Sequence, residues 1–422
     1  MKHGIRFLSL LLCLSVLAGC FTGVTAAQEG TDATILFTHD LHSHFLPAVD
    51  EDGGEYGGYA RLMTAIRQQR EIDLNAILVD GGDFAMGSLF QTAYPTDALE
   101  LRMMGAMGYD ATTFGNHEYD YLSSGLCDML YAALESGDPV PAIVEANFLP
   151  PEEAAEVWAA YDAYGVEPYR LLERGGVVYA IIGLSGYDCR DCAPSSGMIL
   201  EEPAAAAQRT VDEAVAAAKE QFGREPVVVC LSHSGTSGTE GEDYELAQAV
   251  TGIDLIVSGH SHSTHAQPIV VGDTWIVSAG CYGKNLGVVK LTVSGDDVAF
   301  TGYELIPIDE NVADDPEIAA LVEQYKTEVE NGYLANYGMT FDQVLVENPY
   351  EFDDSGDVKR TAHESTLGNL FSDAYKWAVE EATGEKVDVA LTAAGVVRET
   401  IPPLQHQPDD LQQGGLCHAP AQ

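Results

Sequence analysis

Five apolar, strand-like runs in this chain each end in a cluster of polar residues, and this arrangement constrains the fold more than any other feature. The clusters are HDLHSH, DGGD, GNHEYD, SHSG and GHSHSTH, at residues 39–44, 80–83, 115–120, 232–235 and 259–265. Helical stretches separate the runs, which indicates an α/β domain. The loops that follow the strands of an α/β sheet lie along one edge, so clusters that are far apart in the sequence can converge there.

The residue types in these clusters indicate a site for two divalent metal ions. Asp, Asn and His bind hard and borderline cations, and the clusters contain no cysteine. A carboxylate offers two oxygens and can bridge ions held about 3.5–4 Å apart. Glycines 82, 115 and 259 stand beside the polar residues, where tight turns and close backbone approach are needed. The remaining histidines of the clusters, His39, His44 and His265, are expected to be structural.

The same clusters exclude two other classes of hydrolase. A serine hydrolase needs a G-x-S-x-G nucleophile elbow, and neither LSHSG nor GHSHS supplies one. A zincin needs H-E-x-x-H on a helix, whereas this chain has HEYDY. The metal-binding interpretation is therefore the one that the clusters support.

The charge of the chain restricts its partners. Its 66 acidic and 20 basic residues give a formal net charge of -46, so binding of a nucleic acid duplex through a basic face is not expected. An acidic, solvated surface that keeps the protein soluble and monomeric is the plain expectation. An anionic substrate then needs a local positive charge, which bound divalent cations would supply.

The N-terminal segment, residues 1–27, is typical of an export signal. A basic start precedes an apolar run, Phe7–Ala18, that is too short to span a bilayer stably. LAGC, ending at Cys20, resembles a lipobox, and VTAA at 24–27 offers an ordinary cleavage site instead. We therefore expect an exported protein, either a cell-surface lipoprotein or a periplasmic or extracellular one, that touches a membrane only through a lipid anchor.

One further motif, YDCRDC, contains a C-x-x-C pair, Cys189 and Cys192. Such a pair can be redox-active or form half of a zinc site, but a second pair for zinc is missing. A local disulfide, or two free thiols in a loop, is the simpler expectation.

The five clusters resemble the motifs of the calcineurin-like metallophosphoesterases, and the resemblance covers about residues 33 to 305. The matching segments are DLH, GGD, GNHE, SH and GHSH, which end at His42, Asp83, Glu118, His233 and His262. They are most similar to the bacterial 5'-nucleotidase and 2',3'-cyclic-nucleotide phosphodiesterase group. The resemblance implies an α/β fold in which a metallophosphoesterase β-sandwich is flanked by helices.

The resemblance also implies the metal ligands. One ion would be held by Asp40, His42, Asp83 and His262, and the other by Asp83, Asn116, His233 and His260. Asp83 would bridge the two ions, which are zinc, manganese or similar.

His117 is similar to the catalytic histidine of this family. It would stabilise the transition state and protonate the leaving oxygen, and Asp120 would orient its ring. Capping of the following helix is the alternative role of Asp120. Asn116 and His117 would also contact the substrate.

A chain of 422 residues fits two domains or one large one. We expect a catalytic domain at 33–308, a helical linker at 309–343, and at 344–402 a partial 5'-nucleotidase C-terminal domain, which would be a smaller α/β unit. Residues 387–402 of that unit resemble a strand followed by a loop that carries a substrate-binding arginine, Arg398, although Ala393 stands where the family often has asparagine. A tail at 403–422 is expected to be disordered.

These observations predict an exported, divalent-metal-dependent phosphoesterase that acts on nucleotides. The same site would also suit cyclic nucleotides, sugar nucleotides or simple phosphate esters. A non-catalytic metal- or nucleotide-binding surface lipoprotein is the third interpretation. The pairing of His117 and Asp120 with a full ligand set favours an enzyme.

Overall fold

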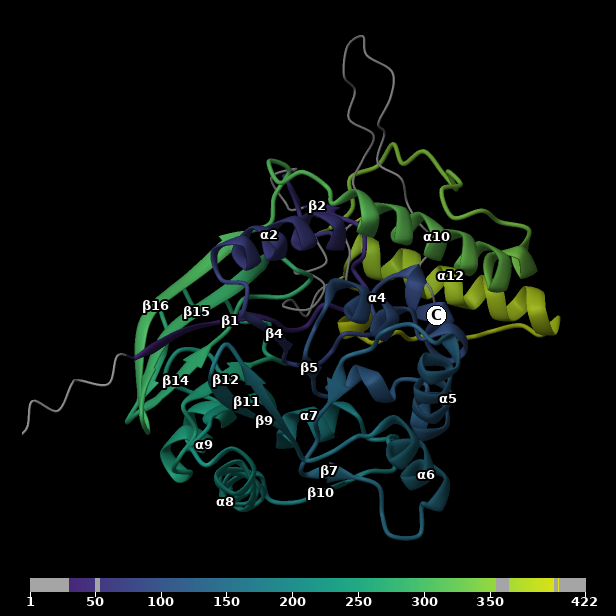
Figure 1. The fold of residues 1–422 in the computed structure, drawn as a ribbon. Coiled ribbons are helices and arrows are strands. Elements are labelled where there is room, and N and C mark those ends of the chain that lie inside the picture. The colour runs from purple at the N-terminus through teal and green to yellow at the C-terminus, as the bar shows by residue number, and fades with distance from the viewer. Residues whose placement is uncertain (1–29, 50–53, 354–363, 398–400, 402–422) are drawn as a thin grey trace, which may run out of the picture.

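Two six-stranded sheets pack face to face, and helices cover both outer faces (Figure 1). The computed structural model describes residues 30–49, 54–353, 364–397 and 401. The predicted α/β sandwich is confirmed. In the described part of the chain no helix is both long and apolar enough to cross a bilayer.

The first sheet has the strand order β16-β15-β1-β4-β5-β6. Strands β1, β4, β5 and β6 are parallel, and β15 and β16 continue the sheet in antiparallel pairs. Its strands are β1 (Thr31–Thr38), β4 (Ile77–Asp80), β5 (Ala111–Thr112), β6 (Ala142–Ile143), β15 (Asn285–Ser294) and β16 (Asp297–Pro307).

The second sheet has the order β13-β14-β12-β11-β9-β8. Its four central strands are parallel, and the two edge strands pair antiparallel. Its strands are β8 (Tyr169–Arg174), β9 (Val177–Ser185), β11 (Val227–His233), β12 (Leu255–Ser258), β13 (Ile269–Val271) and β14 (Thr274–Val277). Two short ribbons pair β2 (Ala48–Val49) with β3 (Glu55–Tyr56) and β7 (Phe148–Leu149) with β10 (Ile199–Leu200).

Side-chain alternation along the strands divides the core into layers. In β1, Ile35 and Phe37 face the second sheet, whereas Leu36 faces the helices outside the first sheet. In β11, Val229 lies between the sheets, whereas Cys230 faces the helices on the other side. Strands buried on both faces are continuous apolar runs, which is why these segments lack polar alternation in the sequence.

The helices form the two outer layers. Helices α2, α4, α5 and α10 contribute to the core outside the first sheet, and α8 and α9 to the core outside the second. The helices are α2 (Tyr59–Ile72), α3 (Tyr94–Asp97), α4 (Leu99–Met107), α5 (Leu122–Ser136), α6 (Ala155–Tyr164), α7 (Tyr187–Cys192), α8 (Pro203–Phe222), α9 (Glu242–Ala249), α10 (Pro316–Gly332) and α12 (Thr366–Thr383). Short 3-10 turns are η1 (Leu89–Ala93), η2 (His117–Tyr119), η3 (Leu334–Tyr337) and η4 (Ala394–Val396).

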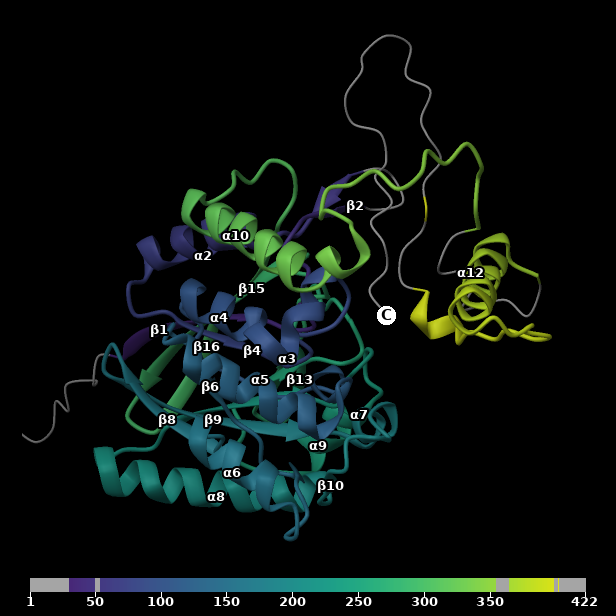
Figure 2. The same ribbon diagram turned by 90° about the vertical axis from the view of Figure 1, so that its right-hand side faces the viewer.

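The segment predicted as a linker contains α10, which packs on the first domain. One face of α10 is buried in the core outside the first sheet, at Ile318, Val322, Tyr325 and Val329. Asp315 caps this helix by accepting hydrogen bonds from the amides of its first turn. The helix is therefore part of the body of the protein, and Figure 2 shows α12 standing apart from that body. The predicted division into domains stays a prediction.

The predicted strand after α12 is wrong for the residues that the structure describes. Residues 387–393 form no ladder there, and Val389 and Leu391 are exposed. A strand needs a hydrogen-bonded neighbour, and no described strand pairs with this segment. Arg398, the export segment at 1–27 and the tail at 403–422 lie outside the described residues.

Glu145, just after β6, is a buried acid that the sandwich keeps away from water. Its carboxylate accepts hydrogen bonds from the amides of Asn147 (3.0 Å) and Phe148 (2.9 Å) and from the Ser185 hydroxyl (3.1 Å). Burial raises the pKa of Glu145 to about 7 despite these bonds. Between about pH 4.5 and about pH 7, Glu145 therefore keeps its proton in the folded protein, whereas it has lost the proton in the unfolded chain.

We expect this proton to make stability depend on pH. A raised pKa in the folded state gives a contribution that is present below about pH 4.5 and is lost as the pH rises to about 7, amounting to about 3 kcal/mol. Between about pH 5 and about pH 8, urea unfolding of chelator-treated protein should show a smaller loss of stability for Glu145→Gln than for the wild type. The exposed Glu152→Gln is the control, and equal pH slopes for all three proteins would contradict the assignment.

Candidate metal centre

The ends of the parallel strands bring the predicted ligands together. Three groups of side chains each place one ligand atom per residue within 4.8 Å of the others. The groups are Asp40, His42 and His262; His42, Asp83 and His117; and Asp83, His233 and His260. Asp83 and His42 each belong to two groups, so the groups form one continuous cluster at the carboxyl edge of both sheets.

The backbone turns sharply at most of the predicted ligands. Five of them have φ in the left-handed region, with values of 51° at Asp40, 50° at His42, 53° at Asp83, 67° at His260 and 53° at His262. This conformation costs a residue other than glycine about 1–2 kcal/mol, and such strain is concentrated at functional sites. In the loop after β1, the turns bring Asp40 and His42 into one group.

Backbone hydrogen bonds tie the loops after β1 and β4 to each other. The Asp40 amide donates to the Gly82 carbonyl and the His42 amide to the Asp83 carbonyl, both at 2.9 Å. Gly115 in the third loop has no room for a side chain, because a Cβ there would lie 2.1 Å from the Asp83 carboxylate. The glycine therefore allows the third loop to approach the bridging position.

Asp83 lies at the centre of the cluster. One of its oxygens, Oδ1, accepts a hydrogen bond from the His117 amide at 2.9 Å, and Oδ2 lies 3.0 Å from Nε2 of His233. Burial alone would raise the pKa of Asp83, but the charges of His233, His117 and His42 outweigh burial and hold the pKa far below its ordinary value. Asp83 is therefore a carboxylate, with both oxygens directed into the cluster.

Asp40 is held by a residue that the sequence analysis assigned only a structural role. His39 Nδ1 donates to Asp40 Oδ2, because His39 Nε2 accepts from the Ala279 amide at 2.7 Å and cannot carry the proton. Burial would raise the pKa of Asp40, but His262 and His39 outweigh burial and hold it well below its ordinary value. His39 therefore orients a predicted ligand, and only its position beside Asp40 pointed to this role.

Two buried polar atoms in the cluster test whether the residues fit a metal ion. Asn116 Oδ1 is buried and accepts no hydrogen bond. His233 Nε2 is also buried, and although it lies 3.0 Å from Asp83 Oδ2, the two atoms are not aligned for a hydrogen bond. His233 Nδ1 faces the Gly81 carbonyl at 2.9 Å, so Nε2 is the nitrogen left for the cluster. Carbonyl oxygen, imidazole nitrogen and carboxylate are suitable ligands for a divalent cation, so the residues fit one.

In the group of Asp40, His42 and His262, a positive charge likewise lies beside a carboxylate. Nε2 of His42 and Nε2 of His262 lie 2.9 Å apart, and the latter is 3.4 Å from Asp40 Oδ1. Burial lowers the pKa of His42. Burial would also lower that of His262, but hydrogen bonds with Asp40 and Cys281 raise it to about 10. His262 is therefore the protonated ring of this pair, and a cation bound here could replace its proton.

Metal affinity is therefore expected to rise with pH. Asp83 raises the pKa of His233 to about 10 against the opposing effect of burial, so His233 and His262 are both imidazolium at neutral pH. A cation must displace the proton of His233 in one ligand group and that of His262 in the other. Because each binding event releases one proton, each apparent Kd for manganese should fall about tenfold per pH unit between about pH 7 and about pH 9. Calorimetry in two buffers of different ionisation enthalpy measures the released protons. Binding without proton release would contradict this assignment.

His117 and Asp120 form a pair at the edge of the cluster. Nδ1 of His117 lies 2.9 Å from Asp120 Oδ2, and its ring centroid is 5.3 Å from that of His42. The helix-capping alternative for Asp120 is not observed, because the residue before α5 is Tyr121 and no side chain caps that helix. The Asp120 carboxylate instead orients the His117 ring.

Glu118 holds two of the ligand-bearing loops together, a role that was not predicted from the sequence. This buried side chain accepts hydrogen bonds from the amides of Asp83 (3.2 Å), Ala85 (2.9 Å) and Gly115 (2.5 Å). It thereby connects the loops after β4 and β5 on either side of the bridging aspartate. Burial, and then the charge of Asp83, raise its pKa well above the ordinary value.

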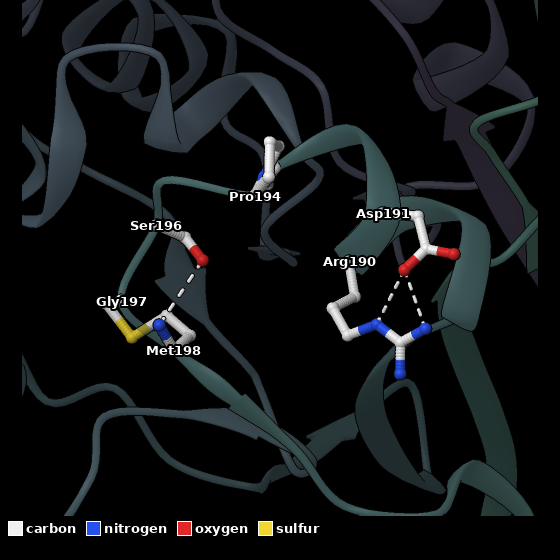
Figure 3. Close-up of a pocket in the computed structure, with 7 residues that line it drawn as sticks. Arg190, Asp191, Pro194, Ser196, Gly197 and Met198 are labelled. Carbon is white, nitrogen blue, oxygen red and sulfur yellow. Dashed lines mark hydrogen bonds and ion pairs between the residues drawn. The ribbon is translucent and has the colours of Figure 1, made fainter.

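A pocket of about 440 Å³ lies beside the end of α7 (Figure 3). Its lining residues are Arg190, Asp191, Ala193, Pro194, Ser196, Gly197 and Met198, none of which is a predicted ligand. The Arg190 guanidinium is already bound to Asp191. This pocket therefore does not supply the positive charge that a phosphate would need.

Comparison with known proteins identifies the family of this arrangement. The profile of the calcineurin-like phosphoesterases matches residues 33–264, which is more than half of the chain and includes all seven predicted ligands. The chain belongs to the calcineurin-like phosphoesterase family. This family uses divalent metals, which agrees with the fit of the cluster to cations.

Relatives of this calcineurin-like phosphoesterase include nucleotide-hydrolysing proteins. It is 30% identical over 397 residues to the trifunctional nucleotide phosphoesterase protein YfkN of Bacillus subtilis (strain 168), covering 88% of this chain and 25% of that protein. It is 27% identical over 381 residues to 5'-nucleotidase of Homo sapiens, covering 82% of this chain and 60% of that protein. The chain thus spans only part of the length of these relatives.

A solved structure shares the fold. The crystal structure of a 5'-nucleotidase precursor from Thermus thermophilus matches with a TM-score of 0.66 and 25% identity. The match covers 83% of this chain and 68% of that one. The two-sheet sandwich of this calcineurin-like phosphoesterase is therefore the fold of a 5'-nucleotidase neighbour.

Proposed function

We propose that this calcineurin-like phosphoesterase hydrolyses phosphate esters of nucleotides, as a 5'-nucleotidase does, with two divalent cations. The observation that carries the proposal is the convergence on Asp83. Two histidines of separate loops, His42 and His233, lie within 4 Å of its Oδ2, and the amide of His117 binds its Oδ1. This places a candidate proton donor beside a candidate bridging ligand.

The two cations, when bound, would supply the positive charge that holds the phosphoryl oxygens and lowers the pKa of an attacking water. In our assignment Asp40, His42, Asp83 and His262 hold one cation, and Asp83, Asn116, His233 and His260 hold the other. The seven ligands include two carboxylates, so the loaded site keeps a net positive charge that suits a phosphate dianion in an otherwise acidic protein.

The chain's own residues then act on the leaving group. The ring of His117, held by Asp120, faces the cluster and in our proposal protonates the oxygen that leaves phosphorus. The backbone amide of the same residue stays bound to Asp83 and fixes the ring beside the reacting phosphate. His117 is therefore anchored to the metal-binding residues through its backbone amide, and in our proposal its side chain transfers the proton.

The substrate class rests on the relatives. The Bacillus protein is named a nucleotide phosphoesterase, and the human and Thermus proteins are 5'-nucleotidases. We carry this class over to the present chain as a proposal, together with export through the N-terminal signal and action as a monomer. The lipobox ending at Cys20 supports surface anchoring.

The test is phosphate release by the purified chain from AMP, ATP, 2',3'-cyclic AMP, a sugar nucleotide and p-nitrophenyl phosphate. Each substrate is tried with manganese or zinc, and again after chelation. Chelator-sensitive release that is fastest on AMP is the expected result. Release from the nitrophenyl ester alone would leave a phosphoesterase without nucleotide selectivity, and no release with any metal would refute the enzymatic proposal.

A further inference from the structure

The C-x-x-C motif lies on a short helix at the rim of the candidate metal centre. Helix α7 carries both cysteines, with Cys189 buried and Cys192 exposed. The Glu242 carboxylate accepts hydrogen bonds from the amides of Tyr187 (2.6 Å) and Asp188 (2.9 Å) and so fixes the start of this helix. The sequence predicted a local disulfide or two free thiols in a loop. The two cysteines form no disulfide, and the predicted loop is wrong because α7 is helical.

The exposed cysteine has metal-binding neighbours that the sequence did not reveal. Asp188, Cys192 and His260 each offer one ligand atom within 4.8 Å of the other two. Asp188 and Cys192 are four residues apart on α7 and so lie on one face of the helix. His260 comes from the loop after β12, and its Nε2 lies 2.9 Å from Asp188 Oδ2.

His260 has a second nitrogen to offer. Its ring also belongs to the group formed with Asp83 and His233, and because Nε2 faces Asp188, Nδ1 is the atom left for that group. The ring thus lies between the candidate metal centre and α7, with one nitrogen directed to each. A neutral imidazole has only one nitrogen lone pair to offer, so His260 can bind cations on both sides only as a bridging imidazolate, after release of its remaining ring proton.

We propose that Asp188, Cys192 and Nε2 of His260 form an additional zinc site at the rim of the candidate metal centre. Thiolate, imidazole and carboxylate are the three donor types that zinc takes in proteins, and three protein ligands leave a fourth position open. The thiolate distinguishes this site from the seven predicted ligands, which contain no sulfur and suit manganese equally well. Cys192 is the single cysteine of this site, and an aspartate and a histidine complete the three ligands.

The surroundings permit this site to fill from solvent. The Asp188 side chain is 70% exposed, and Cys192 is exposed, whereas Cys189 points into the core and is not part of the group. The two acidic ligands, a carboxylate and a thiolate, offset the charge of a divalent cation. When both nitrogens of His260 bind cations, the released ring proton lowers the net charge by one more.

Cobalt is the probe that separates this site from the neighbouring centre. A cysteine ligand gives cobalt a near-ultraviolet thiolate-to-metal band, and none of the seven predicted ligands can produce one. We expect the full chain to develop this band on cobalt titration and the Cys192→Ser variant to lose it. Asp188→Ala keeps the thiol and should need at least about tenfold more cobalt to reach the same band.

Two matched control variants test whether the band depends on the Cys192 thiol and on Asp188 in particular. Cys281→Ser removes another thiol near the candidate metal centre, one that is hydrogen-bonded to His262, and should keep the band. Asp191→Ala changes an exposed aspartate of α7 outside the group and should also keep it. After dialysis, the wild type should retain one zinc ion more than Cys192→Ser.

Three results would overturn the proposal. They are a band that persists in Cys192→Ser, a band lost in Cys281→Ser instead, and equal zinc content of the wild type and Cys192→Ser. Equal zinc content would mean that Asp188 only accepts the His260 proton and orients the ring. Because the readouts are a spectrum and a metal count, they stand even if no phosphate ester is hydrolysed.

Discussion

Replacing His117 with asparagine is expected to lower kcat for phosphate release from AMP by about 10²- to 10⁴-fold while leaving the bound metal unchanged. The side chain supplies the proton to the leaving oxygen in our proposal, whereas its backbone amide, which donates to Asp83 Oδ1, is retained in asparagine. The metal-binding residues should therefore keep their geometry. The measurement is kcat for AMP together with the metal content of the same sample.

The leaving group provides an internal control for this prediction. p-Nitrophenol is a much stronger acid than a ribose hydroxyl and leaves without a proton, so its ester should lose far less rate in His117→Asn than AMP does. Asp120→Asn keeps a hydrogen-bond acceptor for the ring but removes its charge, and a loss of about 10- to 100-fold is expected. Equal losses on both substrates, or loss of metal from His117→Asn, would contradict the role of proton donor.

The convergence of the five clusters could be predicted from the sequence because it follows from strand order alone. Apolar runs that are buried on both faces mark parallel strands, and the residues after them must lie at the same edge of the sheet. Asp40 and Asp83 are brought together in this way in the first sheet. His233, 193 positions after Asp40, joins them from the end of β11 because the second sheet packs on the first. Their roles as ligands stay a prediction.

The supporting contacts could not be predicted in the same way, because they depend on docking. His39 reaches the Ala279 amide and Glu118 reaches the amides of the neighbouring loop only once the strands are paired. Asp188 meets His260 because α7 docks at the carboxyl edge of the second sheet. A six-residue helix is too short for an apolar periodicity to predict it from the sequence.

Helix α10 is a different case, since its pattern was readable. Ile318, Val322, Tyr325 and Val329 recur at helical spacing, which predicts a buried face and hence a neighbour for it. The sequence predicted a charged helical linker there, and the helix is observed. That its apolar face packs on the core outside the first sheet depends on docking.

Replacing Asp83 with asparagine is expected to have the other large effect, which is loss of both cations and of the activity that depends on them. The substitution keeps the size of the side chain but removes the negative charge that faces His233 and His42. A neutral amide has only one oxygen to offer, so it cannot bridge two cations as a carboxylate does. Metal content after dialysis should fall from about two ions per chain to fewer than one.

The pKa of His233 in the metal-free protein tests the charge of Asp83 independently of metal binding. Burial alone would lower the pKa of His233, and the carboxylate of Asp83 is the first of the groups that raise it to about 10. In Asp83→Asn that ring should be neutral at pH values where it is protonated in the wild type, which NMR of the histidine ring can follow in chelator. A wild-type titration of His233 in the variant would mean that the charge of Asp83 does not act on this ring.

Asp254→Asn is the matched control, because it removes a mostly buried aspartate at the opposite end of β12. Asp254 accepts a hydrogen bond from the Val228 amide and lies outside every candidate ligand group of the described residues. Its variant should keep both cations and full activity. If Asp254→Asn loses metal as Asp83→Asn does, the loss reflects general damage to the sandwich. If Asp83→Asn alone loses both cations, a single carboxylate joins the two halves of the centre.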